Sequence, residues 1–66
     1  MSELKDLAEK YLEAEKEYNK SKESDAYYRR NAAFSAFAKA WYDEYEMSLC
    51  SFRAAREAAV EIGCEI

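Results

Sequence analysis

Apolar side chains recur at intervals of three and four along the first twenty positions of the chain. Leu4, Leu7, Tyr11 and Tyr18 belong to this series, and many of the positions between them are Lys or Glu. A helix with about 3.6 residues per turn places such a series on one face and leaves the charged positions to solvent. The pattern therefore predicts an amphipathic helix over residues 3–20.

A polar segment follows, and after it comes a stretch that is apolar on almost every side. Residues 19–25 are all polar or charged and rich in turn formers, which predicts a loop with Ser24 or Asp25 as the cap of a second helix. Residues 32–42 are mostly alanine and aromatic, with Lys39 as their one charge. A helix that is apolar all round must be covered all round, so this stretch needs more than one neighbour.

The second helix either continues through residues 47–51 or breaks there. Two stripes, one of large and one of small side chains, keep their phase across this segment, which favours a single helix over residues 25–62. The primary prediction is an all-α helical hairpin in which a helix of residues 3–20 lies antiparallel to this long helix, completed as a homodimeric bundle. Ser48 within the large-residue stripe and Ser51 as a possible N-cap favour the alternative, a three-helix bundle with a break near 47–51.

The length and the net charge of the chain limit the classes of protein to which it can belong. A chain of 66 residues accommodates a single small helical domain, residues 1–66, and such a domain hides only about 60% of its unfolded surface. Its net charge of −4 argues against a generic nucleic-acid binder. No stretch approaches the roughly 20 apolar residues of a membrane span. Without a secretory signal at the N-terminus, we expect a cytoplasmic protein in which Cys50 and Cys64 are free thiols.

Catalytic and metal-binding patterns are weak in this sequence. There is no histidine for acid–base work, no glycine-rich phosphate loop, and no partner that would activate either cysteine. The cluster of Asp43, Glu44 and Glu46 is interpreted as a solvated helix edge. We therefore expect no enzymatic activity, no metal and no cofactor.

A long second helix would leave apolar surface that the first helix cannot reach. Exposed surface of that kind marks interfaces, and small side chains let two helices approach closely. This predicts self-association, most simply as a two-fold homodimer. The candidate self-association residues are Ala33, Ala36, Ala40, Leu49, Phe52, Ala55 and Ala59.

The chain is rich in side chains that suit protein interfaces, with six tyrosines and one tryptophan. Tyr and Trp bury a large area while keeping a polar group, and Arg shares their enrichment at binding hot spots. Helical phase places Tyr27, Trp41 and Tyr45 in the core, together with Tyr11. Tyr28 and Tyr42 fall off the main apolar stripe and are predicted to be exposed.

Tyr28, Tyr42 and the basic pair Arg29 and Arg30 are therefore the candidate partner-binding residues. The composition predicts a non-enzymatic protein–protein interaction module, an adaptor or inhibitor that occupies a surface of another protein as a homodimer. Two alternatives stay open. One is a nucleic-acid-associated regulator that uses Arg29, Arg30 and Lys39, and the other is a structural subunit of a larger assembly.

Overall fold

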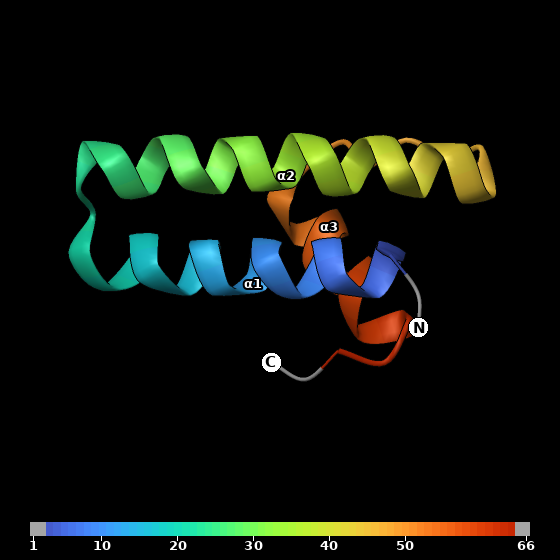
Figure 1. Ribbon diagram of the computed structural model, residues 1–66, viewed down its shortest axis with the longest axis horizontal. Helices are drawn as coiled ribbons and strands as arrows, with labels where there is room; N and C mark the ends of the chain where they lie inside the picture. Colours follow the sequence, from blue (N-terminus) through green and yellow to red (C-terminus); the bar gives the residue numbers. More distant parts are fainter. Residues whose placement is uncertain (1–2, 65–66) are drawn as a thin grey trace.

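A computed structural model describes residues 3–64 of the chain and places three helices among them. They are α1 (Glu3–Ser21), α2 (Ser24–Tyr45) and α3 (Phe52–Glu61). α1 and α2 run antiparallel and side by side, and α3 packs across one face of the pair, in contact with both (Figure 1). The described residues contain no strand, and the all-α prediction is confirmed.

The link between α1 and α2 is shorter than the loop predicted for residues 19–25. Only Lys22 and Glu23 lie between the two helices. Lys22 adopts a left-handed conformation with φ of 56°, and its N–H donates a 2.7 Å hydrogen bond to the Tyr18 carbonyl. A single left-handed residue is enough to end a helix, so the polar residues before it remain helical.

The start of α2 also differs from the prediction. Glu23 is the N-cap, with an extended backbone and no side-chain hydrogen bond to the first turn. Ser24 and Asp25 are the first residues of the helix, so the predicted cap at either position is wrong. Asp25 still contributes, because a carboxylate in the first turn of a helix interacts favourably with the helix dipole.

The predicted long helix over residues 25–62 is wrong, and the alternative with a break near 47–51 is confirmed. α2 ends where Glu46 takes a left-handed conformation and its N–H donates a 2.7 Å hydrogen bond to the Tyr42 carbonyl. The chain then returns behind α2 to begin α3 (Figure 1). Ser51 caps α3, since its hydroxyl accepts a 3.1 Å hydrogen bond from the Ala54 N–H.

This reversal buries the aromatic face of α2 within a single chain. Tyr11 and Phe37 have no exposed surface, and the Tyr11 ring centroid lies 6.4 Å from that of Phe37 and 6.3 Å from that of Phe52. Three alanines let α3 approach this face closely. The buried residues of the core are Leu4, Ala8, Tyr11, Phe37, Trp41, Ala55, Ala58, Ala59 and Cys64.

A polar network at the edge of the core ties α1 to α3. The Glu15 residue is only 8% exposed, and its carboxylate accepts hydrogen bonds from the Tyr11 hydroxyl at 2.7 Å and from Arg56 Nε and Nη2 at 3.1 and 2.6 Å. Burial raises the pKa of the Tyr11 hydroxyl, and its hydrogen bond to Glu15 raises that pKa further. The hydrogen bond with Glu15 also raises the pKa of Arg56. The network helps to hold α3 in its folded-back position.

Candidate protein-binding surface

The tip of the α1–α2 hairpin exposes two neighbouring tyrosines. Tyr28 is exposed as predicted, and its ring centroid lies 5.5 Å from that of Tyr27. Tyr27 is also exposed, so its predicted place in the core is wrong. Its ring packs instead against Tyr18 of α1, with 5.9 Å between centroids. A shallow hollow of about 230 Å³ lies beside these three rings.

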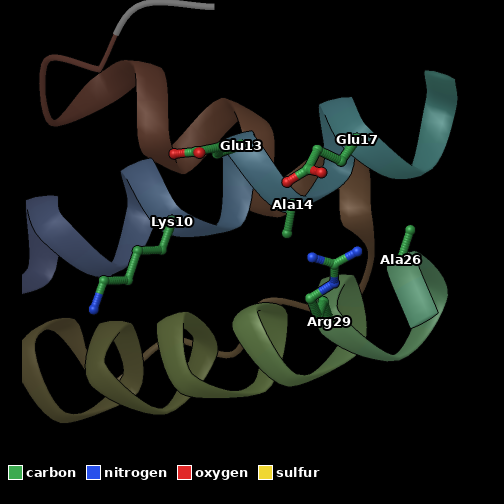
Figure 2. A pocket seen from close by; sticks show the side chains of 6 residues that line it. All are labelled: Lys10, Glu13, Ala14, Glu17, Ala26 and Arg29. Atoms are coloured by element: carbon green, nitrogen blue, oxygen red, sulfur yellow. The ribbon is translucent and has the colours of Figure 1, made fainter. Parts of the chain in front are cut away.

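Arg29 faces the groove between α1 and α2 and not the tyrosines. Figure 2 shows its guanidinium in the gap between the two helices, on the side of Glu17 and Ala14. The groove has a volume of about 230 Å³, and both acidic and basic side chains line it. Arg29 Nε donates a 3.4 Å hydrogen bond to the Asp25 carbonyl. Mixed charge of this kind offers no preference for a ligand of either sign.

Arg30 is packed inward, where its guanidinium lies between three aromatic rings. Its Cζ atom is 4.4 Å from the ring centroid of Tyr18, 5.1 Å from that of Tyr27 and 4.1 Å from that of Phe52. We call this arrangement the Arg30 box. Its cation–π contacts join all three helices. The structure therefore gives Arg30 an internal role in place of the predicted exposed one, because the return of α3 places Phe52 over it.

The four candidate partner-binding residues do not form one site. Tyr28 and Tyr42 are both exposed on α2. They are fourteen positions apart in this helix, which corresponds to about 21 Å along its axis. Arg29 faces the interhelical groove and Arg30 the box. Tyr42 lies one turn before Tyr45, at the opposite end of the molecule from the hairpin tip.

The predicted self-association surface is mostly used inside the chain. Ala55 and Ala59 have no exposed surface, so in this fold they are not available to a second copy. Four others are partly buried and pack against the same core: Ala33, Ala40, Leu49 and Phe52. Ala36 alone among the seven is exposed on the outer face of α2. Most of the surface that a second chain was expected to cover therefore packs against the core of this chain.

The opposite end of the molecule contains a cavity that the sequence analysis did not predict. We call it the aromatic cavity, and its lining residues are Trp41, Tyr45, Met47, Glu61 and Ile62. It has a volume of about 330 Å³. The Trp41 and Tyr45 ring centroids are 4.4 Å apart. Trp41 is buried as predicted, whereas Tyr45 is 46% and Met47 61% exposed, so the placement of Tyr45 in the core is wrong.

Two helices end at the aromatic cavity. Tyr45 is the last residue of α2 and Glu61 is the last residue of α3. A helix C-terminus carries roughly half a negative elementary charge, and neither helix has a basic residue in its last turn. Glu61 adds a carboxylate to the cavity wall. The electrostatic environment of the cavity therefore favours a cation.

A second hollow, between the start of α1 and the last turns of α2, is also acidic. Glu3, Asp43 and Glu44 line it together with Leu4 and Ala40. The residues that line this hollow and the aromatic cavity include no basic side chain. Asp43 and Glu44, interpreted from the sequence as a solvated edge, are indeed exposed.

One signal in the sequence could have indicated the aromatic cavity. Trp41 and Tyr45 lie one helical turn apart, and apolar Met47 comes two positions after Tyr45, where the helix pattern ends. The other wall is formed by Glu61 and Ile62, which are distant in sequence. Only the return of α3 brings these two walls together, and helical phase contains no information about that return.

The described part of the chain contains no cluster of metal ligands and no membrane-spanning helix. Between residues 3 and 64, no group of three or more His, Cys, Asp or Glu side chains is arranged to hold a metal ion. None of the three helices is long and apolar enough to span a bilayer. Both thiols are free, with Cys50 exposed and Cys64 buried. Comparisons of the chain with protein-family models, curated proteins and solved structures find no match.

Proposed function

We propose that the chain is a small non-enzymatic protein-binding module, an adaptor or inhibitor that acts by occupying a surface of another protein. The aromatic cavity and its exposed rim of Tyr45 and Met47 carry this proposal. Exposed apolar side chains around a hollow are typical of interaction sites. Trp and Tyr contribute strongly to binding because they bury a large area at little cost in conformational entropy.

The size of the aromatic cavity supports a protein partner. At about 330 Å³ it lies at the lower end of the range for small-molecule pockets, about 300–1,000 Å³. It can accept one anchoring side chain, while the exposed rings of Tyr42 and Tyr45 supply a surrounding contact surface. An anchor in a pocket with a wider rim is the usual anatomy of a protein interface.

The homodimer predicted from the sequence used a different surface, most of which packs within this chain. We propose a chain that folds as a monomer, because α3 supplies the cover for which a second copy was invoked. A second copy of the chain is then an alternative occupant of the cavity. Light scattering across a range of protein concentrations distinguishes a second copy from a different protein. A constant monomer mass supports a different protein as the partner.

A nucleic-acid-associated regulator is the second candidate. Residues 16–31, at the hairpin tip, contain five basic and three acidic side chains, and this excess favours it. Against it, the Arg30 guanidinium is occupied by the rings of its box. A mobility shift at low salt that disappears at high salt would support this candidate over protein binding.

The test of protein binding is quantitative affinity capture from lysate of the source cells with variant baits. Tyr45→Ser and Met47→Ser remove the exposed rim, and circular dichroism checks that each variant remains helical. Both are expected to lose the proteins that the unmodified chain retains. Tyr28→Ser removes an exposed tyrosine near the other end of α2, so it is the control and should retain them. Loss with Tyr28→Ser alone would place the binding surface at the hairpin tip, and no loss with any variant would contradict the proposal.

A further inference from the structure

We propose that the aromatic cavity binds an arginine or lysine side chain presented by a basic segment of the partner protein. This inference rests on the proposed function and specifies the chemistry of the partner. The cavity combines two aromatic rings, a carboxylate and an apolar wall. Few kinds of side chain can contact all three of these surfaces favourably. Arginine and lysine can, because each has a long apolar stem and a positive charge.

Each surface of the cavity matches one part of such a side chain. The Tyr45 ring, which is 46% exposed, offers a face for a cation–π contact, and buried Trp41 packs against it with 4.4 Å between the ring centroids. The Glu61 carboxylate can accept charge-assisted hydrogen bonds from an ammonium or a guanidinium. Met47 and Ile62 provide apolar contact for the aliphatic stem, which basic side chains bury readily.

The Arg30 box shows the same chemistry at the other end of this fold. There the chain packs its own guanidinium over three rings at 4.1 to 5.1 Å from their centroids. The aromatic cavity has rings and, in addition, a carboxylate, but no basic side chain of the chain lines it. The missing cation would come from the partner.

The charge around the cavity selects a basic segment over an acidic one. The C-termini of α2 and α3 both direct negative partial charge toward this end, without a basic residue in either last turn. Glu3, Asp43 and Glu44, in the separate hollow beside the last turns of α2, add three carboxylates at this end of α2. Such a field accelerates the encounter with a positively charged segment and disfavours an acidic one.

The chain contains a single Trp, so its indole N–H gives one resolved NMR signal that reports on the cavity. The probe is a short peptide in which arginines alternate with leucines, and the control peptide has glutamate in place of each arginine. The arginine peptide is expected to shift the Trp41 signal saturably, and high salt is expected to weaken the effect. No shift with the arginine peptide, or an equal shift with the glutamate peptide, would overturn the inference.

Charge-reversal variants locate the binding site. Glu61→Lys is expected to weaken binding of the arginine peptide by about fivefold or more, since an exposed attraction is replaced by repulsion. Glu17→Lys makes the same change on exposed α1 surface toward the hairpin tip and should leave binding within about twofold. Equal weakening of peptide binding by both variants would mean that binding depends only on the net charge of the protein. It would overturn the assignment of the peptide-binding site to this cavity.

Two further outcomes separate this inference from the proposed function. Should the arginine peptide fail while the rim variants still lose their captured proteins, the partner chemistry is wrong and protein binding stands. A Trp41 signal that moves with protein concentration alone would identify a second copy as the occupant, with its exposed Lys20, Lys22 or Arg29 as the cation. That contact joins unlike surfaces, so it builds a ring or an open chain and not a two-fold dimer, and light scattering would show a mass that rises with protein concentration.

Discussion

Two ion pairs of α3 differ in their contact with water, and double-mutant cycles on both can measure what burial adds. Arg56 donates two hydrogen bonds to the Glu15 carboxylate, which is almost buried, while the Arg56 side chain is 47% exposed. Arg53 and Glu57 are 3.6 Å apart with side chains that are 89% and 71% exposed. The two arginines lie on the same short helix, so the second pair is a matched control.

The expected magnitudes follow from these exposures. A hydrogen bond to a charged group contributes about 1.5–3 kcal/mol, and partial exposure of Arg56 reduces the total by solvent screening. We expect a coupling energy of about 1.5–2.5 kcal/mol for Glu15 and Arg56. For the exposed pair four residues apart on α3, about 0.3–0.5 kcal/mol is expected.

The single variants of the buried pair should be unequal. Arg56→Met leaves the Glu15 carboxylate with one hydrogen bond, from Tyr11, and is expected to lower the free energy of unfolding by about 2–3 kcal/mol. Glu15→Gln keeps one acceptor oxygen, for Arg56, and its amide NH2 can donate to the Tyr11 hydroxyl oxygen, so it is expected to lower the free energy of unfolding by about half as much. A chain of this length has a total stability of about 3–10 kcal/mol, so both changes are measurable.

Urea denaturation followed by circular dichroism gives these free energies, with equal m-values as the check for two-state unfolding. The cycle is completed by the double variant of each pair, with Arg53→Met and Glu57→Gln as the control substitutions. Equal coupling energies for the two pairs would refute the reasoning. They would mean that the Glu15 network adds nothing beyond an ordinary surface pair and does not hold α3 in place.

Three further predictions concern single groups. Ser51→Ala should lower the free energy of unfolding by about 1 kcal/mol in a urea titration, because the Ala54 N–H loses its acceptor. The folded-state pKa of Tyr11 is raised, so its contribution to stability is complete below the ordinary tyrosine pKa of about 10 and is lost as the pH rises above it. Thermal melts from about pH 9 to about pH 11 should therefore show a shallower decline for Tyr11→Phe than for the unmodified chain. Burial, followed by the charge of Glu9, raises the pKa of the Cys64 thiol, so a timed alkylation should modify exposed Cys50 in the native state and Cys64 only after unfolding.

Much of the helical content follows from local patterns in the sequence. The apolar series that begins at Leu4 predicted α1 over residues 3–20, one residue short of its end at Ser21. The hydroxyl of Ser51 marked a possible helix start, and it caps α3. Periodicity and capping depend on neighbouring residues, so a single sequence displays them directly.

The errors arose where a residue's environment depends on distant parts of the chain. The helical phase of Tyr45 is that of a core residue, but the core does not extend as far along α2 as Tyr45. Glu3 and Leu4, at the start of α1, lie opposite Asp43 and Glu44, so α2 extends beyond the helix that would have covered Tyr45. Arg30 shows the converse, because Phe52 of α3 packs over a side chain that was expected at the surface.

The sequence by itself determined that the chain is helical, which face of α1 is buried, and that Trp41 belongs to the core. These properties depend on hydrophobic periodicity, which can be read from the sequence of a helix whatever the helix packs against. Only the tertiary structure decided that the apolar surplus of α2 is covered from within. That outcome depends on one residue, Glu46, taking a left-handed conformation, which removes the continuous helix and reverses the chain. The same reversal places Glu61 and Ile62 against Trp41 and Tyr45, and so creates the aromatic cavity to which the function is assigned.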